Sequence, residues 1–141
     1  MTVETAKDAK TIIAQMRSNP SFGPLDDRAL ERLARSGAIE CGEKGHRFFE
    51  EGDVGDFAYL VIEGEVAIDV RSGRRDVTVA TVGPGGLVGE VAAFANTPRT
   101  ASVIARTETA LLRIEQATIR DLLRDSPDTA MAIIAELGQR L

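Results

Sequence analysis

The clearest strand pattern in the chain lies at residues 57–82, which read FAYLVIEGEVAIDVRSGRRDVTVATV. Val66, Ile68 and Val70 alternate with smaller or polar residues, as expected for a strand with one face in a core. Two polar segments that contain glycine separate the apolar runs, and such residues favour tight turns. We therefore predict three strands, at residues 57–62, 66–70 and 77–82.

The same pattern of short apolar runs separated by turn residues extends from residue 38 to residue 114. Short runs rich in Val, Ile, Phe and Thr are interrupted about every 8–12 residues by turn residues, a spacing typical of an antiparallel sandwich or barrel. Further turns are expected at 52–56 and 83–86, and further strands at 101–105 and 110–114. We predict a jelly roll over about residues 38–115.

Both ends of the chain show helical spacing of apolar residues instead. Helices are expected over about residues 3–36 and about residues 117–141. Asp26 has the side chain to cap the second helix, with Leu25 and Leu30 positioned to pack together across the cap. The predicted fold class is α+β: an antiparallel β jelly-roll sandwich flanked by N-terminal and C-terminal helices, in a single domain of residues 1–141.

A last helix is expected after Ser126, because a proline follows it at the first helical position. Its apolar stripe fits equally well a buried core or a surface that faces a partner. The stripe consists of Ala130, Ile133, Ile134, Leu137 and Leu141.

Composition excludes several function classes. The 141 residues carry 17 Lys and Arg against 22 Asp and Glu, a net charge of −5, which argues against broad contact with nucleic acid. One cysteine (Cys41) and one histidine (His46) provide neither an internal disulfide nor a paired metal-ligand motif. No apolar run approaches the roughly 18 residues of a membrane span, and the N-terminus lacks the basic and then apolar pattern of a signal region. We expect a cytoplasmic protein with no metal and no membrane contact.

Residues 89–103, which read GEVAAFANTPRTASV, carry the chemistry. The run 91–95 suits one helical turn, whose free backbone N–H groups and dipole favour an anion. Gly89 permits close approach of the backbone, and Pro98 stiffens the approach to Arg99. The guanidinium of Arg99 offers a planar charged fork to the same anion. These residues predict a small anionic ligand.

Residues 89–103 resemble the phosphate-binding cassette of cyclic nucleotide-binding domains. This is the family of catabolite activator proteins, cAMP-dependent kinase regulatory subunits and cyclic-nucleotide-gated channels. Residues 49–66, FEEGDVGDFAYLVIEGEV, are similar to the family's strand–turn–strand signature, and residues 82–86, VGPGG, to its usual lead-in. The resemblance covers about residues 25–137, and implies a short helix in the cassette.

The resemblance implies a role for each matching residue. Glu90 would accept a hydrogen bond from the ribose 2′-hydroxyl, Arg99 would pair with the cyclic phosphate, and Thr100 would contact phosphate or a guanine amino group. The other implied positions are the backbone N–H groups of Gly89, Val91 and Ala92, Ala101 beside the phosphate, Val79, Leu87 and Val88 against the base, and Leu137, Arg140 and Leu141 as a lid.

The expected function is that of a stand-alone cyclic nucleotide sensor that moves its C-terminal helices, because the sequence shows no catalytic group arrangement. We expect cAMP as the ligand; cGMP is the alternative, since Thr100 offers the extra hydrogen bond. A second class of function is an interaction module that has lost nucleotide binding. A third class is a cupin-like metalloenzyme, but this chain lacks the histidines that such an enzyme needs. Because the chain ends at Leu141 without a helix-turn-helix, we expect signalling through a downstream protein partner or a homodimer formed by the C-terminal helix, not through DNA.

Overall fold

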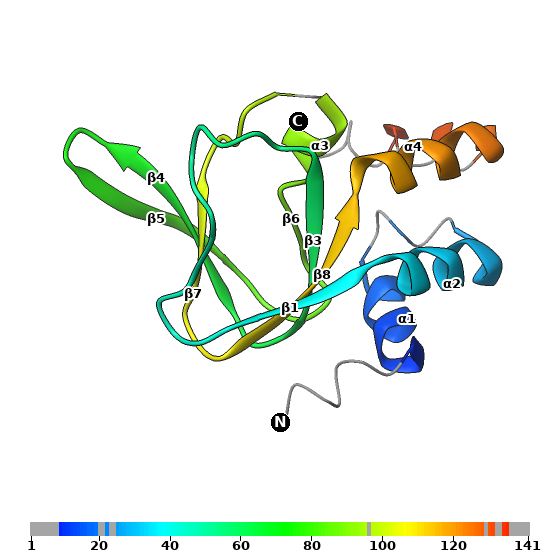
Figure 1. Cartoon of the computed structure of the whole chain (residues 1–141), viewed down its shortest axis with the longest axis horizontal. Helices are drawn as coiled ribbons and strands as arrows, with labels where there is room; N and C mark the ends of the chain where they lie inside the picture. Colours follow the sequence, from blue (N-terminus) through cyan, green and yellow to red (C-terminus); the bar gives the residue numbers. More distant parts are fainter. Residues whose placement is uncertain are drawn as a thin grey trace.

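The computed structural model describes residues 9–19, 22, 25–95, 97–128, 130–131 and 134–135. Two antiparallel sheets face each other, and the helices near the two ends of the chain gather on one side of them (Figure 1). The elements are α1 (Ala9–Arg17), α2 (Asp27–Ser36), β1 (Ala38–Gly42), β2 (Arg47–Phe49), β3 (Phe57–Glu63), β4 (Val66–Ser72), β5 (Arg75–Val82), β6 (Leu87–Val88), α3 (Glu90–Ala95), β7 (Ser102–Ala105), β8 (Thr109–Glu115) and α4 (Gln116–Asp125).

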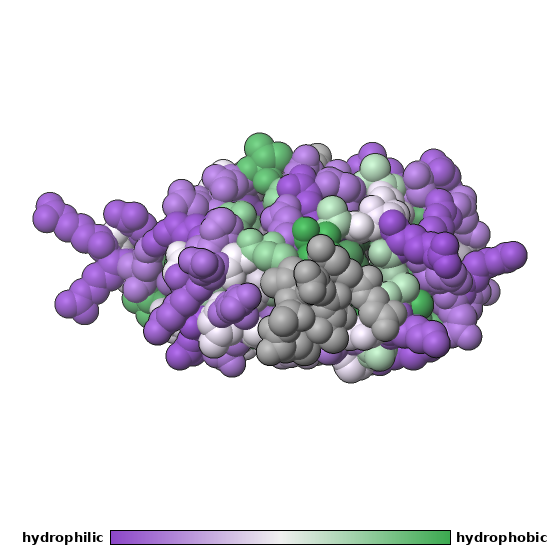
Figure 2. Space-filling model, turned by 60° about the horizontal axis from the view of Figure 1, so that its bottom comes forward, coloured by the Kyte–Doolittle hydropathy of each residue, from purple (hydrophilic) through white to green (hydrophobic). Residues whose placement is uncertain are grey.

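The strand order is β1-β8-β3-β6 in one sheet and β2-β7-β4-β5 in the other. This arrangement confirms the predicted α+β fold, an antiparallel β sandwich with flanking helices. The β4–β5 hairpin extends beyond the body of the molecule at the left of Figure 1. Hydrophilic side chains project from that end of the surface in Figure 2, so the outer part of the hairpin is solvated.

The core has two parts that share strand β3. Tyr59 and Val61 lie between the two sheets, whereas Leu60 and Ile62 face the helices α1, α2 and α4. Both faces of β3 are therefore buried, which explains why this strand is a continuous apolar run while β4 alternates.

The five strands expected from the sequence pattern are confirmed as β3, β4, β5, β7 and β8. Strands β1, β2 and β6 were not expected; β2 has three residues and β6 two. Each of these pairs with a strand distant in sequence, β1 with β8, β2 with β7 and β6 with β3. Segments this short acquire strand geometry from their partners.

The predicted cap of the second helix is confirmed. The Asp26 carboxylate accepts a hydrogen bond of 2.8 Å from the backbone N–H of Ala29. Leu25 and Leu30 are both buried beside it. At the end of α1, the Asn19 side chain donates to the carbonyl of Gly85 at 3.1 Å and so fixes the turn that leads into β6.

At the C-terminal end, α4 confirms the expected helix after the roll. Of the last apolar stripe, Ile134 is exposed, while Ile133, Leu137 and Leu141 lie outside the described residues. Within the described ranges, no helix has the length and apolar character to cross a membrane.

Candidate functional site

A pocket of about 210 Å³ lies between α3 and the strands of the roll, and we refer to it as the α3 pocket. Its apolar wall comes from β2, β4, β5, β6 and β7, and its polar end from the residues around Arg99. The lining residues are Phe49, Ile68, Val82, Leu87, Val88, Gly89, Ala92, Arg99, Thr100, Ala101 and Val103.

Gly89 turns the chain from β6 into α3. Its φ of +77° lies in the left-handed region that favours glycine. A Cβ at this position would also collide with Nη1 of Arg99. Gly89 therefore permits both the turn and the close approach of the arginine.

The Arg99 side chain is buried, with 3% of the residue exposed. Nη1 donates to the carbonyl of Gly89 at 2.9 Å, and Nη2 donates to the carbonyl of Phe57 at 2.6 Å. The guanidinium carbon lies 3.9 Å from the ring centroid of Phe49 and 4.5 Å from that of Phe57. The guanidinium is thus held by two carbonyls and two aromatic rings.

This buried cation is incompletely satisfied. Nε of Arg99 is buried without a hydrogen-bond partner, and no ion pair joins Arg99 to a carboxylate among the residues that the structure describes. Burial lowers the pKa of Arg99, and the positive charge of Arg113 acts in the same direction, whereas the carboxylates of Asp56 and Asp53 oppose it. Since an unpaired buried charge is costly, this end of the pocket is complementary to an anion.

The backbone of Arg99 is fixed by the turn at residues 50–56. Arg99 N–H donates to the carbonyl of Asp53, and Gly52 N–H donates to the carbonyl of Arg99, both at 2.8 Å. Gly55 lets this turn pack against α3, because a Cβ on Gly55 would collide with the Cβ of Ala92. The turn therefore holds the arginine and the helix together.

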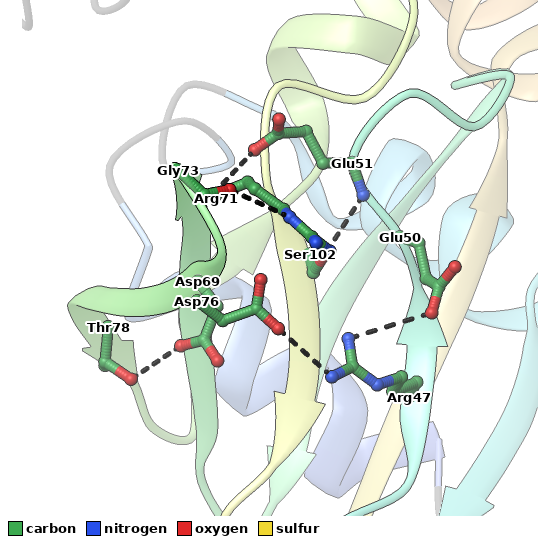
Figure 3. A network of polar contacts seen from close by, with 9 residues as sticks. All are labelled: Arg47, Glu50, Glu51, Asp69, Arg71, Gly73, Asp76, Thr78 and Ser102. Carbon is green, nitrogen blue, oxygen red and sulfur yellow. Dashed lines mark hydrogen bonds and ion pairs between the residues drawn. The ribbon is translucent and has the colours of Figure 1, made fainter.

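Polar contacts anchor that turn to the sheet β2-β7-β4-β5 (Figure 3). Glu51 N–H donates to Oγ of Ser102 at 2.9 Å, and the Glu51 carboxylate accepts from the N–H of Arg71 at 3.2 Å. Arg47 pairs with Glu50 at 3.7 Å and with Asp76 at 3.3 Å. Ser102 directly follows the pocket residue Ala101, so the anchor lies beside the site.

The structure brings most of the expected site residues together. These are Gly89, Ala92, Arg99, Thr100 and Ala101, with the expected base contacts Leu87 and Val88. Thr100 is exposed at the rim.

Other expected residues are not brought to the α3 pocket. Val79 is 60% exposed and does not line it. Glu90 and Val91 belong to α3, but their side chains lie outside the described part of the chain. The expected lid residues Leu137, Arg140 and Leu141 also lie outside the described residues.

Four lining residues were not anticipated as site residues: Phe49, Ile68, Val82 and Val103. These residues are apolar and lie on strands, so the sequence predicts only that they belong to the core. Their meeting at one pocket depends on the pairing of β4 with β5 and β7, and of β2 with β7.

Gln116, the first residue of α4, forms hydrogen bonds with both the turn at residues 50–56 and α3. Its backbone N–H donates to the carbonyl of Asp56 at 2.9 Å, and its side-chain amide donates to the carbonyl of Ala93 in α3 at 2.6 Å. Helix α4 is thus hydrogen-bonded directly to α3 and to the turn that fixes the backbone of Arg99.

A sequence profile described as "Cyclic nucleotide-binding domain" matches residues 42–126, a range that spans the turn, the α3 pocket and α4. The chain belongs to this family. The resemblance noted in the sequence is therefore confirmed.

Two relatives of this chain are named as a regulatory subunit and a regulator. The chain is 31% identical over 121 residues to a cAMP-dependent protein kinase regulatory subunit of Yarrowia lipolytica, covering 86% of this chain and 31% of that protein. It is 32% identical over 122 residues to a CRP-like cAMP-activated global transcriptional regulator of Mycobacterium tuberculosis, covering 85% of this chain and 54% of that protein. The domain thus spans about a third to a half of these relatives' length.

Solved structures agree with the fold. The N-terminal domain of a transcriptional regulator from Streptomyces coelicolor A3(2) matches with a TM-score of 0.80 and 35% identity, covering 89% of this chain and 91% of that chain. The regulatory domain of Toxoplasma gondii PKA, crystallised with cAMP, matches with a TM-score of 0.79 and 25% identity, covering 89% of this chain and 48% of that chain.

The described ranges contain no group of three or more His, Cys, Asp or Glu side chains placed to hold a metal ion. The chemistry visible at the site is therefore that of Arg99, backbone amides and an apolar wall.

Proposed function

We propose that residues 1–141 form a single sensor domain that binds a cyclic nucleotide in the α3 pocket, without catalysing a reaction. One observation carries the proposal: Arg99 places a buried cation with an unpaired Nε at the polar end of a pocket in this family. A phosphodiester supplies the missing negative charge and further hydrogen-bond acceptors.

Arg99 and the start of α3 act together on the cyclic phosphate. The first N–H groups of a helix lack partners within it, and here they precede the first internal bond, from Ala93 N–H to the carbonyl of Gly89 at 3.2 Å. The backbone N–H groups of Gly89, Val91 and Ala92 would contact phosphate oxygens, beside Ala101. A charge-assisted hydrogen bond contributes about 1.5–3 kcal/mol, so the guanidinium supplies much of the phosphate affinity.

The apolar wall fits the remainder of the nucleotide. Leu87 and Val88, together with Ile68 and Val82, offer an uncharged surface for the purine. Glu90 would accept a hydrogen bond from the ribose 2′-hydroxyl. Leu137, Arg140 and Leu141 stay predicted lid residues.

We favour cAMP as the ligand, since the relatives are named for cAMP. cGMP is the alternative, because the Thr100 hydroxyl at the pocket rim is able to meet the guanine amino group. Thr100→Ala separates the two: it weakens cGMP binding more than cAMP binding if the hydroxyl meets the guanine.

Signalling would follow from the attachment of α4 to the site. A nucleotide that binds one arrangement of α3 more tightly than another shifts the population of the helices joined to it. Gln116 carries that shift into α4 through its bonds to Ala93 and Asp56. The output would pass to a downstream protein partner or a homodimer, in the cytoplasm and without DNA or membrane contact.

Calorimetric titration of the chain with cAMP, cGMP and adenosine 5′-monophosphate tests the proposal. We expect saturable 1:1 binding of a cyclic nucleotide and much weaker binding of the acyclic one, whose doubly charged phosphate has a different shape. Absence of binding by either cyclic nucleotide would reject the sensor function and favour an interaction module that has kept only the fold.

A further inference from the structure

Phe57 contacts two arginines. The guanidinium carbon of Arg99 lies 4.5 Å from its ring centroid, and that of Arg113 lies 3.7 Å from the same centroid. Arg99 also donates to the backbone carbonyl of Phe57 at 2.6 Å. A single residue of β3 therefore supports the buried pocket arginine with its ring and with its backbone, and Arg113 is the second cation on that ring.

The register of the sheet explains how Arg113 reaches Phe57. Phe57 pairs with Glu115 of β8, and Tyr59 pairs with Arg113. Arg113 is therefore the diagonal neighbour of Phe57 on the same face of the sheet, a separation that a long side chain spans. The contact follows from the pairing of β3 with β8.

Two carboxylates fix the Arg113 guanidinium over the ring. Nε donates to Oε1 of Glu115 at 2.6 Å, and Nη1 donates to Oε1 of Glu40 at 3.4 Å. Glu40 in turn accepts a short hydrogen bond of 2.5 Å from the hydroxyl of Tyr59. Arg113 is thus a neutralised, oriented cation, unlike Arg99, which has no such carboxylate among the described residues.

The aromatic rings connect this cluster to the pocket. The Tyr59 ring lies 5.1 Å from that of Phe57, edge to face, and 6.1 Å from that of Phe49, stacked. Phe49 is the second ring under Arg99, at 3.9 Å. A displacement of Phe57 therefore changes the surface on which the pocket guanidinium rests.

We infer that Arg113 is a positioning residue for the α3 pocket: by holding the Phe57 ring, it fixes the orientation of the Arg99 guanidinium. The consequence for ligand affinity rests on the proposed function; the orientation of Arg99 does not. Arg113 does not itself line the pocket. Its effect on a nucleotide is carried through Phe57 and Arg99.

Arginine side-chain NMR of the ligand-free chain tests the orientation directly. The Arg99 Nε–H lies beside two rings, so ring currents shift its proton resonance, and Arg99→Lys assigns the signal by its loss. We expect Arg113→Gln to move this resonance toward the position typical of a solvated arginine. Arg106→Gln, a change at an arginine that pairs with the half-buried Glu65, is the matched control and leaves it in place.

Phe57 variants provide the second route, should Arg113→Gln fail to fold. Phe57→Leu is expected to move the Arg99 resonance and Phe57→Tyr to preserve it, because tyrosine keeps the ring. In the Phe57→Leu background, Arg113→Lys causes no further shift, whereas in the wild-type background it does. Equal shifts from Arg113→Lys in both backgrounds would overturn the inference, because Arg113 would then act without Phe57.

Titration with cAMP measures the consequence. We expect Arg113→Gln to weaken binding about threefold to tenfold and Arg106→Gln to leave it unchanged. A wild-type chain that binds no cyclic nucleotide would reject the proposed function, and the Arg99 resonance would still decide the positioning role. A wild-type chain that binds, with neither resonance nor affinity altered in Arg113→Gln, would overturn the inference alone.

Discussion

Gln116 donates a hydrogen bond of 2.6 Å from its side-chain amide to the backbone carbonyl of Ala93. The two residues belong to the helix that leaves the roll and to the short helix that borders the α3 pocket. Gln116 is also bound through its own N–H to the carbonyl of Asp56, so two hydrogen bonds join the start of α4 to α3 and to the turn at residues 50–56. The bond from the side chain is the one that a substitution can remove.

Gln116→Leu is expected to uncouple α4 from ligand binding. Leucine keeps a similar size but cannot donate to Ala93, so the cyclic nucleotide would no longer reduce hydrogen exchange in the first turn of α4. The affinity for the nucleotide should change less than threefold, since Gln116 does not line the α3 pocket. Hydrogen exchange with and without cAMP measures the effect, and Arg120→Gln on the same helix is the control. Undiminished protection of α4 by cAMP in Gln116→Leu would contradict the coupling.

Gly55→Ala tests the close packing of the turn against α3. A methyl group there would overlap the Cβ of Ala92, so we expect a loss of about 1–3 kcal/mol in the free energy of unfolding. Gly83→Ala is the matched control, because no atom of the described residues lies within 4 Å of a Cβ at that glycine. Urea unfolding of both variants measures the difference. Equal free energies of unfolding for the two variants would contradict the close packing, because the turn would then accommodate the methyl group without loss of stability.

We expect Tyr59 to make the free energy of unfolding depend on pH in the alkaline range. Burial raises its pKa above the ordinary 10.0, and the hydrogen bond and charge of Glu40 raise it further. Above pH 10 the unfolded chain therefore holds fewer protons than the folded one. The free energy of unfolding then falls as pH rises, by about 1.4 kcal/mol per pH unit for this group. Below that pH the contribution is fully present.

The ionisation of Tyr59 can be followed by ultraviolet absorbance, because Tyr59 is the only tyrosine and the chain has no tryptophan. Phenolate absorbance should show no transition near pH 10 while circular dichroism still reports a folded chain. Glu40→Gln should bring the transition to lower pH, and Tyr59→Phe should flatten the alkaline loss of stability. A midpoint near 10 in the folded wild type would contradict the buried hydrogen bond.

The sequence identifies those parts of the fold that local patterns specify. Alternation at Val66, Ile68 and Val70 predicts β4, and the polar side chain of Asp26 predicts the start of α2. The two residues of β6 have no pattern of their own and become a strand only through pairing with Tyr59 and Leu60. Pairing between distant segments is not visible in a local pattern.

The candidate site divides in the same way. Gly89 and Arg99 are recognisable from their spacing, but the support of Arg99 by Phe49 and Phe57 depends on how β2 and β3 fold together. Val79 was expected against the base, yet it is 60% exposed. The pairing of β5 with β4 shifts register at this point, from Ala80 opposite Ile68 to Thr78 opposite Asp69, so Val79 falls at an irregularity of the strand. Such an irregularity redirects a side chain, and simple alternation along the strand does not predict it.

The binding of cAMP by Arg99→Ala and by wild type, compared in calorimetric titrations, tests the role of the pocket cation most directly. Arg74→Ala, at an exposed arginine of the β4–β5 hairpin, removes the same charge away from the pocket. We expect Arg99→Ala to weaken cAMP binding at least tenfold, about 1.4 kcal/mol or more, and Arg74→Ala to leave it unchanged. Equal affinity of the wild type and Arg99→Ala would contradict the assignment of Arg99 to the cyclic phosphate.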